Sequence, residues 1–227
     1  MIANQKQVVK SATQDKLVKK LLDRLIAAIA LFCLIPLLII VAIAVHFRMG
    51  DPILFTQTRS GRRGRIFKVY KFRSMTNDCD RNGNLLSDED RLTSFGKFIR
   101  RVKLDETLQL WNILKGDMSF VGPRPTLPEQ VQDYQDWQKT RLYVTPGLTG
   151  WAQVNGNTEL TWTERICLDI WYLHHWSLWM DMEILLKTLL VVIWGERRNE
   201  KALSKALKYA QYTLKVDFDQ PVAESLR

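Results

Sequence analysis

The sequence predicts an α+β fold that is mostly α-helical, in which an N-terminal re-entrant membrane helix, a small β-hairpin and amphipathic interfacial helices pack around a cytoplasmic core. Three features lead to this prediction: a charge-free apolar run at residues 25–45, strand-like alternation at 51–75, and helix-periodic or long apolar segments after residue 100. We expect the membrane segment at 1–48, the core domain at 49–195, and a C-terminal tail at 196–227 that is helical in part.

The apolar run Leu25–Val45 has 21 residues without a charge, which at about 1.5 Å per residue could just cross a hydrocarbon core of about 30 Å. Pro36 lies in its middle, where a proline removes a helix hydrogen bond. Cations flank both ends, with Lys20 and Arg24 before the run and Arg48 after it, and such flanks favour the cytoplasmic side. We therefore predict that the segment enters and leaves the membrane on one side, with a break at Pro36. A kinked single span is the alternative.

A second apolar segment, residues 171–194, is rich in tryptophan. Its four tryptophans are Trp171, Trp176, Trp179 and Trp194. A single tryptophan is more often part of a core, but tryptophans are enriched where a protein meets the membrane interface. In a chain with a membrane helix, the set predicts a membrane-facing helix.

Residues 51–75 alternate like two strands around the turn SGRRG and predict a β-hairpin. Seven cations and no acid occur from Arg59 to Arg73. Lys71 and Arg73 are two residues apart on one predicted strand face, where they could grip phosphates. A solvated face along an anionic membrane is the alternative.

The net charge of +9 predicts an anionic partner. No nucleic-acid-binding motif is recognisable beside the membrane segment, so we expect no nucleic acid. The three cysteines have neither the spacing of a disulfide framework nor that of a zinc site, which favours a reducing compartment.

An acidic pair, Asp105 and Glu106, follows a basic cluster. Apolar residues recur at helical spacing from Leu104 to Leu114, and Gly116 follows as a stop signal, so the pair is predicted in the first turn of a helix. Acids there favour the helix dipole by only about 0.3–1 kcal/mol. A nucleophilic role would require nearby cations that neutralise the phosphates under attack.

Cations suited to that purpose are close in sequence. Arg100, Arg101 and Lys103 precede the pair, and Arg124 follows in the sequence GPRP. The two prolines restrict the backbone around Arg124, which suits a guanidinium held for bidentate phosphate binding.

Four motifs, KFRSM, LDETLQLWNILKGDMSFVGPRP, TPGLTGWAQVNG and LDIWYLHHWSLWMDMEILLKT, occur in this order. Their order and spacing resemble those of the bacterial sugar transferase family of monotopic polyprenyl-phosphate phosphoglycosyltransferases, from about Lys16 to Trp194. The resemblance implies an enzyme of the bacterial inner membrane, with a catalytic domain on the cytoplasmic face. Such an enzyme transfers a phospho-sugar from a UDP-sugar to undecaprenyl phosphate, releases UMP and initiates a surface glycan such as O-antigen, capsule, exopolysaccharide or a glycoprotein glycan. Whether the protein forms a homo-oligomer is left open by the sequence.

The resemblance also implies roles for particular residues. Asp105 would be the nucleophile that forms a covalent phospho-sugar intermediate, and Glu106 its partner in a catalytic dyad. Mg2+ would neutralise the diphosphate and contact Asp105, and Pro36 would be the membrane break. The residues expected to bind substrate are Lys71, Arg73, Arg100, Arg124, Arg141 and Asp169.

Two departures from the family pattern are visible. The dyad motif reads DETLQL where relatives usually read DELPQL or DELLQL. Asn157 stands where many relatives have an arginine near the nucleotide phosphates, so Arg141, Arg165 or a different donor geometry is expected to compensate.

A non-catalytic alternative is a basic membrane-surface module that recruits partners or anionic lipid. The dyad together with GPRP and KFRSM favours the transferase. Release of UMP from UDP-sugars in the presence of undecaprenyl phosphate would separate the two readings.

Overall fold

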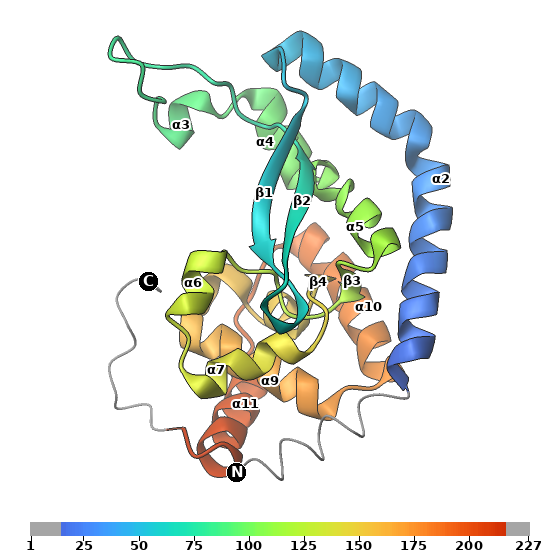
Figure 1. Ribbon diagram of the computed structural model, residues 1–227, viewed down its shortest axis with the longest axis vertical. Coiled ribbons are helices and arrows are strands. Elements are labelled where there is room, and N and C mark those ends of the chain that lie inside the picture. Colours follow the sequence, from blue (N-terminus) through green and yellow to red (C-terminus); the bar gives the residue numbers. More distant parts are fainter. Residues whose placement is uncertain (1–14, 217–227) are drawn as a thin grey trace.

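The computed structural model describes residues 15–216, which form helices around two small sheets (Figure 1). The α-helices are α2 (Asp15–Met49), α3 (Asp88–Arg91), α4 (Ser94–Arg101), α5 (Gln109–Lys115), α6 (Pro128–Gln132), α7 (Asp136–Lys139), α8 (Trp151–Val154), α9 (Trp162–His175), α10 (Leu178–Trp194) and α11 (Glu200–Thr213). The strands are β1 (Leu54–Ser60), β2 (Ile66–Phe72), β3 (Ser119–Val121) and β4 (Gly147–Thr149). Short 3-10 helices are η1 (Arg62–Gly64), η2 (Leu104–Glu106), η3 (Thr140–Tyr143) and η4 (Asn157–Glu159). The predicted mostly helical α+β class is confirmed.

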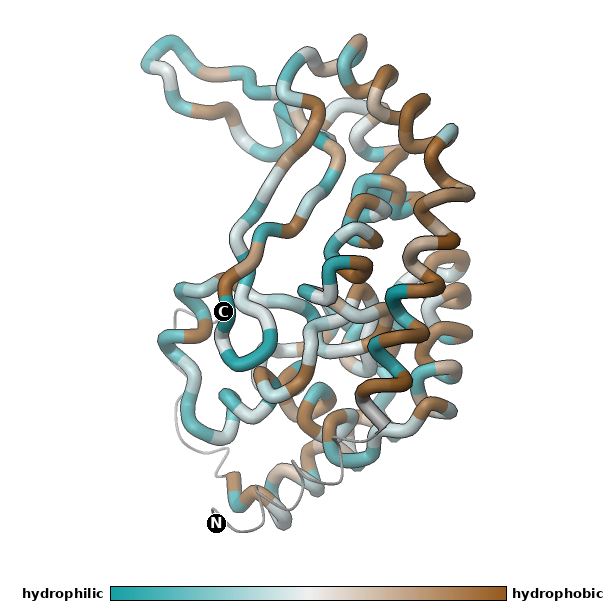
Figure 2. Tube along the Cα trace, turned by 45° about the vertical axis from the view of Figure 1, so that its right-hand side comes forward, coloured by the Kyte–Doolittle hydropathy of each residue, from teal (hydrophilic) through white to brown (hydrophobic). Residues whose placement is uncertain are grey.

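Helix α2 is the long apolar helix expected at the N-terminus. Residues Leu17–Met49 are long and apolar enough to cross a membrane. Ala27, Val41 and Val45 on one face are buried against the rest of the protein, whereas most of the other face is exposed and apolar, as the brown stretch along α2 shows in Figure 2. Such a face indicates membrane association.

Pro36 lies inside α2 without ending it. Proline has no backbone N–H, so the carbonyl of Phe32 cannot receive its usual helical hydrogen bond. Instead of the predicted break, α2 continues as one helix and curves around the protein (Figure 1). Re-entrant insertion stays a prediction.

The predicted hairpin is confirmed. Strands β1 and β2 are antiparallel, with register from Leu54↔Phe72 to Ser60↔Ile66. In the turn, Arg63 adopts φ 57° and Gly64 φ 75°, which closes the connection between the strands.

A second sheet positions the GPRP loop. Strands β3 and β4 are parallel, and the backbones of Gly122 and Gly147 approach so closely that a side chain on either would collide with the other strand. The Gly122 N–H donates to Thr149 O at 2.9 Å, and the Gly147 N–H donates to Pro123 O at 2.9 Å. The loop that carries Arg124 is therefore held by backbone contacts at its first two residues.

The largest hydrophobic core joins β3 and helices α8 to α11. Helix α11 contributes Ala202, Leu203, Ala206 and Ala210 to this core and packs on α9. Part of the predicted tail is thus packed into the protein, while residues 1–14 and 217–227 of the predicted segments lie outside the described residues.

The four tryptophans expected at the membrane divide into two pairs. Trp179 and Trp194 are 82% and 64% exposed on α10. Trp171, by contrast, stacks on Trp151 and on His175, and Trp176 donates to the carboxylate of Asp181 at 3.1 Å. Only the α10 pair therefore faces outward as predicted.

Candidate active site

The acidic pair lies on a tight turn between α4 and α5. Asp105 and Glu106 belong to the 3-10 helix η2, and Lys103 before it adopts the left-handed conformation with φ 58°. Helix α5 begins only at Gln109, so the prediction that the pair lies in its first turn is wrong by about one turn. The apolar spacing predicted an early helix start because Leu104 in η2 and Leu108 after it both pack against the core.

Glu106 is held by two cations. Its Oε1 accepts hydrogen bonds from Lys71 Nζ at 2.6 Å and from Arg124 Nη2 at 3.1 Å. Burial alone would raise the pKa of Glu106, but Arg124 and Lys71 outweigh it and lower the pKa to about 2. Glu106 is therefore a fixed anion.

Asp105 has the opposite environment. It is 8% exposed, and its buried Oδ1 has no hydrogen-bond partner among the described residues. Burial and the neighbouring charge of Glu106 raise its pKa, while Lys71 and Arg100 act against this. A buried carboxylate oxygen without a hydrogen-bond partner destabilises the ligand-free protein. This oxygen is therefore available to a ligand.

The tertiary structure brings five predicted residues together. Lys71 comes from β2, Arg124 from the loop after β3, and Arg100 from the end of α4, where its Nε donates to Ser74 Oγ at 2.7 Å. With Asp105 and Glu106 they form what we call the dyad cluster. Its cations come from separate elements and its acids from one turn.

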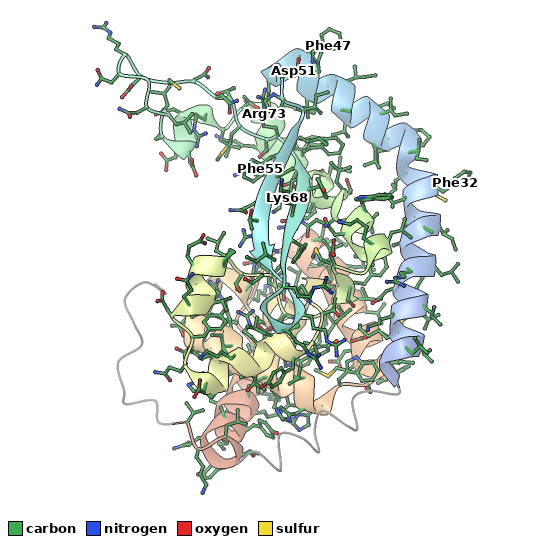
Figure 3. The ribbon with its side chains drawn as sticks, in the orientation of Figure 1. Phe32, Phe47, Asp51, Phe55, Lys68 and Arg73 are labelled. Atoms are coloured by element: carbon green, nitrogen blue, oxygen red, sulfur yellow. The ribbon has the colours of Figure 1, made fainter. Side chains whose placement is uncertain are left out.

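Arg73 lies elsewhere. Its guanidinium donates to the carbonyls of Met49, Gly50 and Asp51 at the end of α2. Figure 3 shows Arg73 near Asp51. The strand ends at Phe72, so the alternation that placed Arg73 on the face of Lys71 does not continue. In this structure Arg73 joins the hairpin to the end of α2, and a contact with substrate stays a prediction.

Arg141 and Asp169 form a buried ion pair with Nη2 to Oδ2 at 2.5 Å. Burial alone would lower the pKa of Arg141, but the Asp169 carboxylate raises it. Arg141 also donates to Tyr134 Oη at 2.8 Å and to the carbonyl of Arg124 at 3.2 Å. The bond to the Arg124 carbonyl helps to hold the GPRP loop, and a direct contact with substrate stays a prediction.

Two residues that support the site were not singled out from the sequence. Arg59 donates to Pro125 O at 3.4 Å, so the hairpin also holds the GPRP loop. Ser74 binds Arg100. The signals were present, because Arg59 begins the cationic run and Ser74 lies in KFRSM.

At Asn157 the side chain Nδ2 donates to Glu196 Oε1 at 2.5 Å. Of the two proposed substitutes for the missing arginine, Arg141 is occupied by Asp169. Burial lowers the pKa of Arg165, the carboxylates of Glu196 and Asp169 act against this, and the charges of Arg124 and Arg141 act with it. Arg165 donates through Nε to Leu160 O at 3.1 Å, and its compensation for the missing arginine stays a prediction.

The residues present fit a Mg2+ ion only where the substrate phosphates supply part of its ligands. No group of three His, Cys, Asp or Glu residues that could hold a metal occurs within residues 15–216. Mg2+ is commonly bound by one or two carboxylates together with substrate phosphates and water. The unpartnered Oδ1 of Asp105 meets that requirement as a single protein ligand.

Comparison of the sequence with known proteins identifies the family of this chain. The chain is 45% identical over 181 residues to an uncharacterized sugar transferase, EpsL, of Bacillus subtilis, a match that covers 79% of this chain and 89% of that protein. It is 41% identical to the UDP-glucose:undecaprenyl-phosphate glucose-1-phosphate transferase of Xanthomonas campestris, covering 77% of this chain and 38% of that protein. It is 39% identical to the undecaprenyl-phosphate galactose phosphotransferase of Salmonella typhimurium, covering 64% and 34%. The chain thus spans most of the Bacillus protein but well under half of the other two.

The family model for bacterial sugar transferases matches residues 14–195. This range includes α2, the hairpin, the dyad cluster and α10. The chain belongs to the bacterial sugar transferase family.

Proposed function

We propose that this chain transfers a phospho-sugar from a UDP-sugar to undecaprenyl phosphate, releasing UMP and initiating a surface glycan. Relatives named as undecaprenyl-phosphate sugar transferases support the reaction class. The observation that carries the proposal is the asymmetry of the dyad: Glu106 is anchored by Lys71 and Arg124, whereas the buried Oδ1 of Asp105 has no partner among the described residues.

The reaction would proceed in two displacements. In the first, a carboxylate oxygen of Asp105 attacks the β-phosphorus of the donor, a new P–O bond forms, and the bond to the α-phosphate oxygen breaks as UMP leaves. In the second, a phosphate oxygen of undecaprenyl phosphate attacks the same phosphorus and the acyl phosphate bond to Asp105 breaks. The phospho-sugar passes to the lipid, and Asp105 is regenerated.

The chain's own groups would assist each step. Lys71 and Arg124 lie beside the dyad and would stabilise the negative charge that gathers on the transferred phosphoryl oxygens. Glu106 holds both cations in place, since they share its Oε1. When bound at Asp105 and the diphosphate, Mg2+ would supply further neutralisation of the phosphates.

We infer further that the protein is monotopic, with its catalytic part on the cytoplasmic face of the inner membrane. The rest of the protein contacts α2 along both halves, through Ala27 near its start and through Val41 and Val45 near its end. A spanning helix would be surrounded by lipid over its hydrophobic length. A helix covered on one face by the catalytic part favours insertion from one side.

Topology can be tested by single cysteines at Lys20 and Lys68, placed in a cysteine-free background, with membrane-impermeant labelling of intact cells and inverted vesicles. Both positions should label only in inverted vesicles, since both ends of the inserted segment face the cytoplasm. Opposite accessibility of the two positions would exclude insertion from one side.

The covalent mechanism is tested with donor and Mg2+ alone. The wild-type enzyme should release UMP in a burst of about one equivalent without lipid acceptor, and mass spectrometry should find a phospho-sugar on the peptide that contains Asp105. Asp105→Asn should show neither, because an amide is a poor nucleophile. UMP release that always requires acceptor, with no adduct trapped, would overturn this mechanism.

A further inference from the structure

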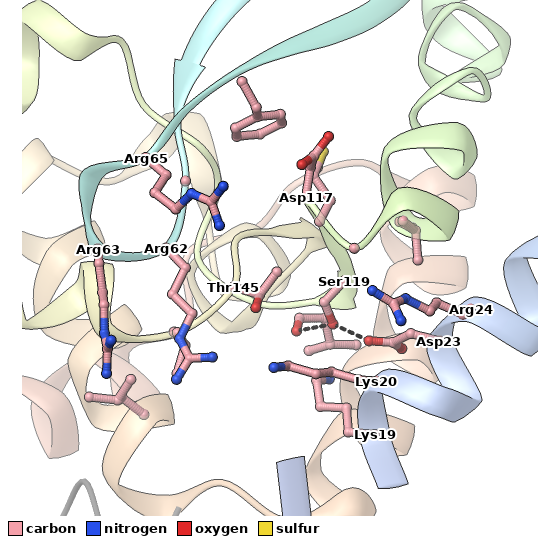
Figure 4. Close-up of a pocket in the computed structure, with 18 of the residues that line it drawn as sticks. Lys19, Lys20, Asp23, Arg24, Arg62, Arg63, Arg65, Asp117, Ser119 and Thr145 are labelled. Carbon is pink, nitrogen blue, oxygen red and sulfur yellow. Dashed lines mark hydrogen bonds between the residues drawn. The ribbon is translucent and has the colours of Figure 1, made fainter. Parts of the chain in front are cut away.

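A cavity of about 370 Å³ lies between the beginning of α2, the hairpin turn and the start of β3. Figure 4 shows its lining. Six cations line it: Lys19, Lys20, Arg24, Arg62, Arg63 and Arg65. None of the residues predicted for catalysis or substrate binding is among its lining residues. We call it the cationic cavity.

The acids around the cavity do not balance these charges. Asp23 accepts a hydrogen bond from Ser119 Oγ at 2.6 Å, and Asp117 is paired with Lys115 at 2.7 Å. Lys19 is paired with Asp181.

Five cations of the lining remain without a carboxylate partner within the part of the chain that the structure describes. They are Lys20, Arg24, Arg62, Arg63 and Arg65, of which Arg24 donates to the backbone carbonyl of Lys115. Like charges gathered in a cavity repel one another, so the arrangement favours an anionic occupant.

The cations are also oriented for a shared ligand. Lys20 and Arg62 point toward one another across the cavity in Figure 4, and Arg65 extends into it from the hairpin turn. Arg62 is fixed on one side, because its Nε donates to Tyr143 O at 3.1 Å. Its terminal nitrogens are left for the cavity. Guanidinium and ammonium groups around one point suit the oxygens of a phosphate.

The position of the cavity indicates where such a phosphate is available. Lys20 and Arg24 lie on α2 just before the charge-free run Leu25–Val45, so they would reach the headgroup layer when that run is inserted. Apolar side chains, including Met118 and Leu173, line the same cavity beside the cations.

We propose that the cationic cavity binds a phosphate group at a site separate from the dyad cluster. The phosphate would be carried by a membrane phospholipid or by a small soluble molecule. The proposal does not depend on the transferase reaction, and its test contains neither sugar donor nor acceptor.

The test uses the full chain in an uncharged detergent, with the melting temperature followed by tryptophan fluorescence. One arm adds short-chain phosphatidylglycerol, with a diacylglycerol of the same chains as the phosphate-free reference. The other arm adds inorganic phosphate, with chloride at equal ionic strength as the reference. A rise confined to phosphatidylglycerol identifies a lipid phosphate, and a rise with inorganic phosphate identifies a soluble one.

The variant Lys20→Met/Arg65→Met removes two exposed cations of the cavity. Its half-saturating concentration should rise about tenfold or more, since two charge-assisted contacts are lost. The control Arg81→Met/Lys97→Met removes the same net charge outside the cavity and should respond like wild type.

Equal responses of the cavity variant and the control would overturn the proposal, as would a wild-type protein that neither compound stabilises. If the double variant does not fold, Arg65→Met alone replaces it, because Arg65 is exposed on the turn.

Discussion

The dyad cluster and the cationic cavity both gather basic side chains around the hairpin, but they differ in what balances the charge. In the dyad cluster, Lys71 and Arg124 share Glu106 as a counter-ion. In the cavity, Lys20 and Arg65 have no carboxylate partner within residues 15–216. Cations that share a counter-ion within the protein are held in one position, where they could stabilise the charge of a transition state. Cations without one are stabilised only when a ligand arrives.

The largest effect is expected at the buried ion pair Arg141–Asp169, in which the cation has a carboxylate partner and both groups are shielded from solvent. Arg141→Met should destabilise the protein by about 3–5 kcal/mol, because it leaves the Asp169 carboxylate buried and unpaired. Denaturant unfolding in detergent would measure this. Arg141→Met/Asp169→Leu should recover much of the loss, and a double variant as unstable as the single one would contradict the charge argument.

Glu106 predicts a pH dependence of stability. Its pKa in the folded protein is about 2, below the ordinary glutamate value of 4.5, so its contribution to stability is present above pH about 4.5 and is lost as pH falls toward 2. Wild type should lose about 3 kcal/mol more over this range than Glu106→Gln, from 1.36 kcal/mol per pKa unit. Parallel unfolding profiles of the two proteins would show that Glu106 is not held as described.

Substitution of Lys71 tests whether the cations paired with Glu106 contribute to catalysis. Lys71→Met should lower kcat/KM for UMP release by about 10- to 100-fold, because one of two charges beside the reacting phosphate is removed. Lys68→Met, on the same strand but exposed, is the matched control and should stay near wild type. A loss of similar size in the control would point to the overall charge of the strand.

The smallest effect is expected in the unbalanced region. Without lipid or phosphate, Arg65→Gln should leave stability unchanged or raise it by about 0.5 kcal/mol, because it relieves repulsion and breaks no ion pair. Unfolding midpoints in uncharged detergent would show this. A clear destabilisation would mean that Arg65 has a structural partner.

Much of the fold was readable from local patterns. The charge-free run predicted the long helix α2, alternation predicted the hairpin, and Gly116 correctly marked the end of α5 with φ 87°. Periodicity carries this information because it reports which face of a segment is buried. The periodicity predicted a helical turn at the acidic pair but not that this turn is a separate 3-10 helix. A 3-10 turn and the first turn of an α-helix have nearly the same apolar spacing.

The sequence by itself determined the acids, the cations and the rigid loop from which a site could be made. Only the tertiary structure decided their use: Lys71 is 35 residues from Glu106 and Arg124 is 18 residues from it, yet both bind one carboxylate oxygen. Arg73, two residues from Lys71, instead holds the end of α2. The physical reason is that a side chain's partner across the fold depends on where distant backbones cross, and no local pattern encodes that crossing.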